Sequence, residues 1–392
     1  MNAAPLVVLA AGGTGGHVFP AEALATVLAA RGYRLALATD DRGAAYGGAL
    51  GGIETYRLRI PPLGPGLVAR IKGVAGMGLA IFATQRLLKR LRPQAVVGFG
   101  GYPSVPTVYA ATRIVVPTLI HEQNAVLGRA NRLLASRVDA IATSFARTRL
   151  LGDAQARLAT RTGNPVRPAV IAFAQASYSP PAAGEMLRIL VTGGSQGAAV
   201  FSRILPVAFA ALAPAERAGV SIVQQCRPEE IEKTRAAYRA AGIAAELATF
   251  FSDLPNRLAS AHLVIARAGA STAAELAVVG RPAILVPYPA AADDHQSDNA
   301  RALLDAGGAW VMPQPQFTAD ALAARLAGLI ADPTPLSAMA MAARTLAIPD
   351  AAERLADLVM KLAPLSAAMS PATASEIIGR IDRATRTMES PA

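Results

Sequence analysis

Short apolar runs alternate with longer amphipathic stretches through most of the chain. In the first half, the runs that predict strands lie at residues 6–11, 33–38, 53–59, 95–98, 117–120 and 139–143. In the second half, they lie at 187–191, 220–224, 246–250, 263–266, 283–286 and 309–312, and only helical patterns follow residue 317. Continuous apolar runs are typical of strands buried on both faces of a parallel sheet. The alternation therefore predicts an α/β fold.

The first apolar run leads into a glycine-rich loop, and the second half of the chain repeats this arrangement. Residues 12–16 read GGTGG and precede an amphipathic run over 21–31. Residues 192–197 read TGGSQG and precede a helical run over 198–212. In a strand, glycine loop and helix, backbone N–H groups can approach an anion closely. The repeat predicts two similar α/β domains, with the Pro- and Ala-rich segment 174–184 as the best linker candidate.

The amino-acid composition limits the kinds of partner that this protein can bind. The 392 residues are enough for two domains, and 38 Lys and Arg against 27 Asp and Glu give a net charge of +11. This surplus favours nucleic acid, anionic lipid or phosphorylated substrates. A single cysteine, Cys226, excludes an internal disulfide and fits a reducing cytoplasm. We expect a soluble or peripheral protein, because the N-terminus does not resemble a signal peptide and no apolar run reaches the ~18 residues of a membrane span.

Polar side chains follow several of the predicted strands. His17 follows the first glycine loop, Tyr102 lies in a second glycine turn, and Glu122 and Asn124 follow the strand at 117–120. Open parallel sheets bind ligands outside the carboxyl ends of their strands. We therefore expect these side chains to converge on one cleft.

Two stretches of the second half each allow two interpretations. Residues 267–275 read RAGASTAAE, so Ser271 or Thr272 with Glu275 has the spacing of a capping box. The alternative is a helix N-terminus that holds a diphosphate, with Glu275 accepting the hydroxyls of a ribose. Residues 293–299 read DDHQSDN, which is either a metal site or, more simply, an acidic start to a helix.

The stretch at 67–91 is unusual. Its uncharged part, which includes Gly73 to Phe82, is flanked by arginine and lysine. One interpretation is an ordinary loop and crossover helix with a solvated basic face. The other is a membrane-surface patch whose apolar side chains enter the interface while basic ones meet anionic headgroups.

Seven motifs together resemble one enzyme family. In chain order they are AGGTGGHVFPAEALA, GFGGYPSVP, HEQNAVLGRANR, GNPVR, TGGSQGA, RAGAST with Glu275, and DDHQSDNA. A lone glycine loop is a weak signal, but these motifs in this order closely resemble the MurG family of peptidoglycan N-acetylglucosaminyltransferases from about residue 5 to 345. The resemblance implies a GT-B architecture of two Rossmann-like domains facing each other across a cleft. Residues 1–166 would form the acceptor and membrane side, 167–345 the donor domain, and 346–392 helices that cross back, with a tail.

The resemblance also implies roles for individual residues. The UDP-N-acetylglucosamine donor would be bound by Thr14, Gly15, Gly16, Asn124, Arg167, Ser195, Phe251, Ala270, Ser271, Thr272, Glu275 and Gln296. Within this set, Glu275 would bind the ribose, the segment around Phe251 would lie against the uracil, and Gln296 would bind the sugar hydroxyls. The acceptor diphosphate would be cradled by Gly12, Gly13, Gly100 and Gly101.

The implied reaction moves N-acetylglucosamine to the C4 hydroxyl of the N-acetylmuramoyl unit of lipid I, with inversion, giving lipid II. His17 is the first candidate base because imidazole titrates near neutrality, and Glu122 is the alternative. A structural role for His17, with its ring bonded to the glycine loop or to an acceptor phosphate, stays open. Tyr102 and Asn124 would position the substrates. The helix near Ser271, with Arg167 or Arg267, would balance the charge on UDP.

No cofactor or metal is required by this scheme, although a divalent cation could stimulate it. The expected partners are UDP-N-acetylglucosamine, undecaprenyl-linked lipid I, an anionic membrane surface, and other cell-wall synthesis proteins, but no nucleic acid. The expected location is peripheral, on the cytoplasmic face of the bacterial inner membrane. The competing interpretations are a UDP-sugar epimerase, a diacylglycerol glycosyltransferase of the same fold, a nucleotide-binding module without activity, and a Rossmann dehydrogenase, which the glycine spacing disfavours.

Overall fold

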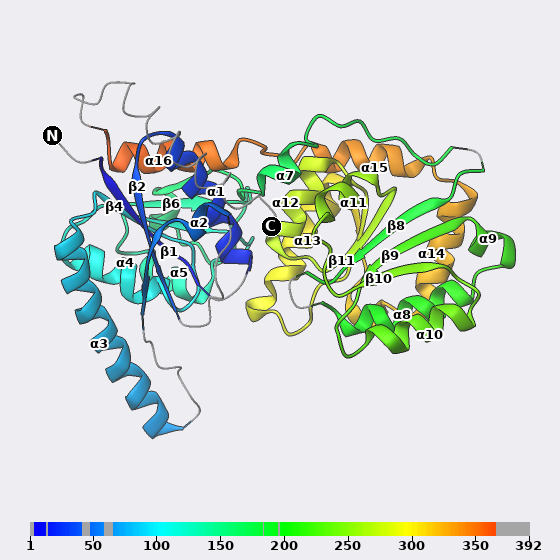
Figure 1. Ribbon diagram of the computed structural model, residues 1–392, viewed down its shortest axis with the longest axis horizontal. Coiled ribbons are helices and arrows are strands. Elements are labelled where there is room, and N and C mark those ends of the chain that lie inside the picture. Colours follow the sequence, from blue (N-terminus) through cyan, green and yellow to red (C-terminus); the bar gives the residue numbers. More distant parts are fainter. Residues whose placement is uncertain are drawn as a thin grey trace, which may run out of the picture. The chain divides into compact units, whose positions relative to one another are not determined.

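The computed structural model describes residues 4–12, 15–40, 48–58, 66–182, 184–194 and 197–365 (Figure 1). Within these residues the chain forms two compact units. The first takes in residues up to 123, then 127–165 and the chain from 350 onward, and the second takes in 124–126 and 166–349. The segment at 174–184 therefore does not separate the units. Its Tyr178 packs on the core of the second unit and donates a hydrogen bond to the His262 carbonyl oxygen at 3.0 Å.

The first unit is built on a parallel sheet. Its strands are β1 (Leu6–Ala10), β2 (Arg34–Thr39), β3 (Glu54–Arg57), β4 (Ala95–Gly98), β5 (Thr118–Glu122), β6 (Ala140–Thr143) and β7 (Ala159–Arg161). Their order is β3-β2-β1-β4-β5-β6-β7, so the order reverses between β1 and β4. Ligands of such sheets bind at this switch point, outside the carboxyl ends of the strands. The two strands that meet there lead into the two glycine-rich turns of this half.

Helices cover the sheet of the first unit. They are α1 (Gly15–Ala30), α2 (Gly48–Gly51), α3 (Leu67–Leu91), α4 (Ser104–Arg113), α5 (Arg129–Leu134), α6 (Asp153–Ala156) and α16 (Ala351–Leu362). The last of these returns from the end of the described chain to pack on α1. Leu355 and Val359 of α16 are buried in the same core as Leu24 of α1, and Tyr33 donates a hydrogen bond to the Ala363 carbonyl oxygen at 2.6 Å.

The second unit repeats the plan. Its strands are β8 (Leu187–Thr192), β9 (Val220–Gln225), β10 (Ala245–Ala248), β11 (Leu263–Ala266), β12 (Ala283–Leu285) and β13 (Ala309–Val311). The order β10-β9-β8-β11-β12-β13 is again parallel and reverses between β8 and β11. The glycine loop after β8 and the turn at Arg267 after β11 therefore flank the switch point, as in the first unit.

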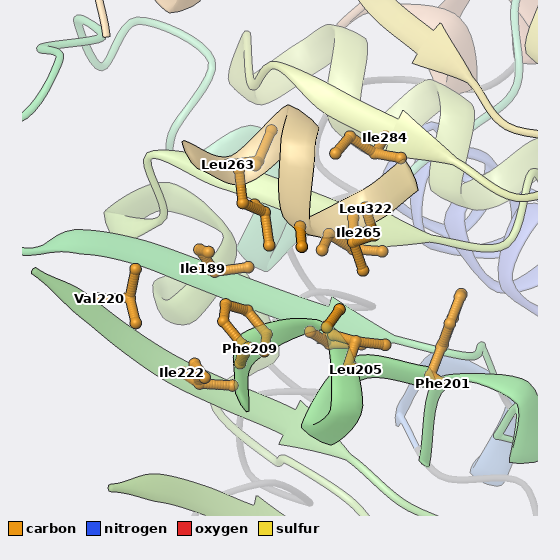
Figure 2. Close-up of a cluster of buried hydrophobic side chains, with 14 of the residues drawn as sticks. Ile189, Phe201, Leu205, Phe209, Val220, Ile222, Leu263, Ile265, Ile284 and Leu322 are labelled. Atoms are coloured by element: carbon orange, nitrogen blue, oxygen red, sulfur yellow. The ribbon is translucent and has the colours of Figure 1, made fainter. Parts of the chain in front are cut away.

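Helices on both faces bury the second sheet. They are α7 (Pro168–Ile171), α8 (Ala199–Ala210), α9 (Pro214–Ala218), α10 (Ile231–Ala240), α11 (Leu254–Ser260), α12 (Ala270–Val279), α13 (His295–Ala306), α14 (Ala319–Ala331) and α15 (Pro335–Arg344), with 3₁₀ turns at Ala292–Asp294 and Gln314–Gln316. Figure 2 shows Ile189 and Ile265 of the strands facing Leu205 and Phe209 of α8, with Leu322 of α14 beside them. The predicted α/β fold is confirmed.

Three local features differ from the sequence predictions. Helix α1 begins at Gly15 instead of residue 21, so His17 lies in its first turns and Pro20 inside it. The stretch at 67–91 forms one continuous helix, without a loop. No sequence pattern predicted β7, because this edge strand is short, polar and largely exposed.

By length and apolarity, no single helix of the described residues could cross a membrane. The bent pair of α14 and α15 passes that test together, with an angle of 103° between them. Leu322, Leu326 and Leu336 of this pair are buried in the core of the second unit, which accounts for their apolar composition.

Candidate active site

In the first unit, the two glycine-rich turns and His17 come together. Gly100 and Gly101 have φ angles of 81° and 75°, the left-handed region that glycine adopts without strain. A Cβ atom on Gly100 would lie 3.2 Å from Cε1 of His17, and one on Gly101 would lie 3.4 Å from its Cδ2. The imidazole therefore rests against the backbone of this turn. Gly12 packs still more closely on the same turn, since a Cβ there would lie 2.3 Å from Cγ of Pro103.

His17 is held by a neighbouring glutamine. Its Nδ1 lies 3.3 Å from Oε1 of Gln123, and the Gln123 side chain is buried. Tyr102 follows the turn and is half-buried, and burial raises the pKa of its phenol. The Tyr102 hydroxyl therefore keeps its proton at neutral pH.

Glu122 has a different environment from the one that the sequence suggested. It is the last residue of β5, not a loop residue, and is 1% exposed. Its Oε2 accepts hydrogen bonds at 2.8 Å from the Gly128 backbone N–H and from Nδ2 of Asn131. These bonds tie the carboxylate to the chain that leads into α5, so Glu122 stabilises the fold here and we leave it out of the mechanism proposed below.

Asn124 packs with the second unit. Its Oδ1 accepts a hydrogen bond from Nδ2 of Asn299 at 3.1 Å, and Oδ1 of Asn299 accepts one from the Ala125 N–H at 2.8 Å. Nδ2 of the fully buried Asn299 also donates to the Ala268 carbonyl oxygen at 3.1 Å. Asn299 of α13 thereby fixes Asn124 next to the turn that precedes α12.

The start of α12 is not a capping box. The helix begins at Ala270, its N-cap is Gly269 without a side-chain cap, and Ser271 and Thr272 lie within the first turn. The capping-box interpretation is therefore wrong, because both hydroxyls lie past the capping position. The N–H groups of a first helical turn have no acceptor within the helix and attract anions. This leaves the diphosphate interpretation for Ala270 to Thr272.

Arg167 and Glu275 form an ion pair in the second unit. Nε and Nη2 of Arg167 both donate to Oε1 of Glu275, at 3.1 and 2.9 Å. The Glu275 side chain is 13% exposed and that of Arg167 is 26% exposed. Burial raises the pKa of Glu275, and the Arg167 guanidinium opposes that rise. The pair brings together two residues that the resemblance assigned to the nucleotide.

Gln296 and Arg267 organise the loops beside α12. Oε1 of Gln296 accepts hydrogen bonds from the Ala268 and Tyr288 N–H groups at 3.2 and 2.9 Å, so a contact with sugar hydroxyls falls to its Nε2. The buried Arg267 guanidinium donates to the carbonyl oxygens of Val286 and Pro287, both at 3.1 Å. Burial lowers the pKa of Arg267. Arg267 stays charged as arginines do, but these hydrogen bonds direct its guanidinium at backbone carbonyl oxygens.

The aromatic pair at 250–251 is split between solvent and core. Phe251 is 7% exposed and its ring lies 4.4 Å from the Arg257 guanidinium, whereas Phe250 is 73% exposed. A base stacking on this segment would meet Phe250 first.

The sequence predictions for Gly13, Thr14 and Ser195 lie outside the described residues. In the described parts of the chain, no three His, Cys, Asp or Glu side chains are grouped to hold a metal.

Sequence reasoning missed two residues. Gln123 and Asn299 both lie within motifs that were recognised, yet neither was assigned a role. Their partners are 106 and 175 residues away in the sequence, so only the fold reveals them. The signal that could have found them is an amide side chain near a candidate residue, since Gln123 directly follows Glu122 and Asn299 lies three residues after Gln296.

Comparison with known proteins identifies the family. Residues 7–143 match the glycosyltransferase family 28 N-terminal domain, and residues 188–355 match the corresponding C-terminal domain. The chain is 56% identical over 365 residues to a UDP-N-acetylglucosamine–N-acetylmuramyl-(pentapeptide) pyrophosphoryl-undecaprenol N-acetylglucosamine transferase of Rhodospirillum centenum, covering 93% of this chain and 96% of the relative. A protein of the same name from Rhodopseudomonas palustris is 52% identical, covering 93% and 100%.

Comparison with solved structures gives the same family. The crystal structure of Acinetobacter baumannii MurG is 32% identical and superposes with a TM-score of 0.71, covering 91% of this chain and 99% of that one. A UDP-N-acetylglucosamine 2-epimerase superposes with a TM-score of 0.61 at 14% identity, which shows a shared fold alone. Because the high identity extends over nearly the full length of the relatives, the chain belongs to the MurG family of N-acetylglucosaminyltransferases, within glycosyltransferase family 28.

Proposed function

We propose that this protein transfers N-acetylglucosamine from UDP-N-acetylglucosamine to the C4 hydroxyl of the N-acetylmuramoyl unit of lipid I, giving lipid II for peptidoglycan synthesis. The observation that carries this proposal is the 56% identity, over 93% of the chain, to a relative whose name states both donor and acceptor. Two groups of described residues support it as well. They are Arg167, Glu275 and Gln296 in the second unit, and the imidazole of His17 in the first.

The second unit would hold the donor. The first turn of α12 at Ser271 would receive the diphosphate, because its N–H groups and the helix dipole both favour an anion. Glu275 would accept the ribose hydroxyls through the carboxylate that Arg167 holds in place. Nε2 of Gln296 would donate to the sugar, since its Oε1 already anchors Ala268 and Tyr288.

His17 would act as the general base. Displacement at the anomeric carbon needs a group that takes the proton of the attacking hydroxyl, and an imidazole with a pKa near neutrality suits this task. The same step places negative charge on the departing UDP. The α12 dipole and Arg167 would stabilise that charge, so we infer that no metal is obligatory and that activity persists in a chelator, with any cation effect limited to stimulation.

The first experiment measures UDP release from UDP-N-acetylglucosamine by the full chain, with and without a lipid I analogue. We expect release that depends on the acceptor and yields a disaccharide product. His17→Ala should lower kcat by at least ~10²-fold while donor binding is retained. Release without an acceptor, or a changed donor sugar, would indicate an epimerase and overturn the proposal.

A second part of the proposal concerns the membrane that carries the acceptor. Helix α3 is the long helix that extends beyond the sheet of its unit in Figure 1. Leu79 and Phe82 are 71% and 52% exposed on it, and the Arg86 guanidinium lies 4.5 Å from the Phe82 ring. At 100° per residue, these three side chains fall within an arc of about 60°, with Lys72 and Lys89 beside them. The buried side chains of α3, such as Leu88, lie on the opposite face.

This face has the composition of a peripheral membrane contact. Apolar side chains enter the interface and flanking cations meet anionic headgroups. We place the protein on the cytoplasmic face of the inner membrane, peripherally, with α3 as the contact and with other cell-wall synthesis proteins as its neighbours there.

Sedimentation with vesicles tests the contact. The full chain should bind vesicles that contain phosphatidylglycerol more tightly than neutral phosphatidylcholine vesicles, and the difference should shrink with salt. The double variant Leu79→Asp and Phe82→Asp should weaken binding by tenfold or more, because each buried side chain contributes about 1.5–3 kcal/mol. The matched control is Val207→Asp, at an apolar residue of α8 that is 57% exposed. Equal losses in both proteins would refute the assignment to α3.

A further inference from the structure

A chain of hydrogen bonds runs from His17 into the core of the first unit. Nδ1 of His17 lies 3.3 Å from Oε1 of Gln123, and Nε2 of Gln123 lies 3.1 Å from Nδ1 of His121. Nε2 of His121 lies 3.1 Å from the Gly163 carbonyl oxygen. Both His121 and Gln123 are buried, at 0% and 2% exposure, so the two contacts of the His121 ring are shielded from solvent, and the His17 contact is partly so.

Carbonyl oxygens at two points fix the direction of every bond in the chain. The Phe99 carbonyl oxygen lies 2.8 Å from the Gln123 carboxamide and can only accept, so the nitrogen of that carboxamide must face it. The His121 carbonyl oxygen, 3.3 Å from the same nitrogen, makes the same demand. Oε1 of Gln123 is therefore the atom that faces His17.

The His121 end of this series of hydrogen bonds gives the same donor-to-acceptor direction. The Gly163 carbonyl oxygen accepts, so Nε2 of His121 carries the hydrogen. In a neutral ring Nδ1 then has the lone pair, which receives a hydrogen from Gln123. Burial keeps this ring neutral, because it lowers the pKa of His121 to about 4. Its donor and its acceptor are both satisfied, as the core requires.

We propose that Gln123 is a positioning residue that holds His17 in the tautomer with the hydrogen on Nδ1, leaving the lone pair on Nε2, and that His121 and the Gly163 carbonyl oxygen fix Gln123 in turn. Oε1 of Gln123 can only accept, so Nδ1 of His17 must donate to it. The proton taken from the acceptor hydroxyl then goes to Nε2. This inference rests on the proposed role of His17 as base, but its tautomer part is testable without any turnover.

A glutamine suits this task better than a glutamate. A carboxylate at position 123 would face the Phe99 carbonyl oxygen and the lone pair on Nδ1 of His121, with no hydrogen for either. The neutral carboxamide orients His17 without placing a negative charge beside it. His121, which interacts electrostatically with the imidazole of His17, stays neutral above its own pKa.

The direct test is nitrogen-15 NMR of the histidine side chains in the full chain at pH 8. The sequence has four histidines, so single substitutions suffice to assign them. We expect the Nδ1–H tautomer for His17 and the Nε2–H tautomer for His121. In Gln123→Met, which keeps the side-chain length but removes both amide atoms, His17 should shift toward the Nε2–H form that a free imidazole favours. An Nε2–H tautomer in the wild type, or no shift in the variant, overturns the proposal.

The kinetic test separates positioning from folding. Gln123→Met should lower kcat about 10- to 100-fold with KM for UDP-N-acetylglucosamine changed less than about twofold, and adding it to His17→Ala should cost little more. The matched control is Gln224→Met, which removes another fully buried glutamine, one that accepts a hydrogen bond from Tyr238 in the second unit. It should destabilise that unit without changing the pH profile of kcat.

The outcomes are distinct. Unchanged kcat in Gln123→Met, or a loss matched by Gln224→Met at equal folded fraction, overturns the positioning role. If the wild type releases no UDP with the lipid I analogue, the proposed function fails instead. The tautomer measurement then still decides whether Gln123 orients the ring.

Discussion

Acid should destabilise the first unit through His121. This side chain lies in β5, fully buried, and donates from Nε2 to the Gly163 carbonyl oxygen. Burial lowers its pKa from 6.5 to about 4, and the hydrogen bond to Gly163 opposes only part of that effect. Between these two values the unfolded chain takes up a proton that the folded chain does not bind.

The size of the effect follows from the pKa difference. Because the folded pKa is the lower one, the contribution to stability is complete above pH 6.5 and is lost as the pH falls toward 4. One pKa unit corresponds to ~1.4 kcal/mol, so the loss from this one group is about 2 kcal/mol at pH 5 and about 3 kcal/mol below pH 4. A typical domain has only about 5–15 kcal/mol in total, so the effect is large.

The assay is urea unfolding of the wild type and of His121→Gln at several pH values between 7 and 4, followed by circular dichroism. Glutamine cannot titrate, but its amide can still donate to Gly163. The free energy of unfolding of the first unit should fall by about 2 kcal/mol more in the wild type than in the variant between pH 7 and 5. The only tryptophan, Trp310, lies in β13 of the second unit, so its fluorescence reports the unit that the substitution does not touch.

Two outcomes would refute this reasoning. If both proteins lose stability in parallel as the pH falls, His121 is not the titrating group. If the Trp310 transition changes its pH dependence in the variant, the effect is not local to the first unit.

Two further predictions concern the second unit. Gly193→Ala should abolish donor binding or destabilise this unit, because a Cβ there would lie 2.3 Å from the Ala198 nitrogen and 2.4 Å from the Gly197 carbonyl carbon. Calorimetric titration with UDP measures donor binding, and the Trp310 unfolding transition measures stability. The control Gly328→Ala, in an exposed turn of α14 with nothing within 4 Å, should instead stabilise it by about 0.5–1 kcal/mol, and a stabilised Gly193→Ala would contradict the packing argument. Glu275→Gln should raise KM for UDP-N-acetylglucosamine about tenfold or more with a smaller change in kcat, because it weakens binding of the donor in the ground state. Initial rates over a series of donor concentrations measure both constants. A lower kcat at constant KM would place Glu275 in the chemical step instead.

The strands at both switch points were predictable because the information is local. The runs that became β1, β4 and β11 are continuously apolar, and the run of β8 is interrupted only by the exposed Arg188. A strand buried on both faces needs such an apolar composition. The glycine turns after β4 and β8 were predictable for a related reason. Gly100, Gly101 and Gly194 have φ angles of 81°, 75° and 74°, which few residue types besides glycine adopt.

Local patterns failed where a side chain's environment is built from distant parts of the chain. Glu122 follows an apolar run and looked like a loop carboxylate, yet the strand continues through it and Gly128 and Asn131 occupy its Oε2. Ser271 and Glu275 had capping-box spacing, but the helix start at Ala270 and the ion pair with Arg167, 108 residues away, remove that interpretation.

What the sequence by itself determined was therefore the fold class, the family and the set of chemically capable residues, because these depend on residue type, order and periodicity. Only the tertiary structure decided which of these residues are hydrogen-bonded to one another. His17 meets a glutamine 106 positions along the chain, and His121 meets a carbonyl oxygen 42 positions along. A hydrogen bond depends on distance and direction in space, and no local pattern carries either across such separations.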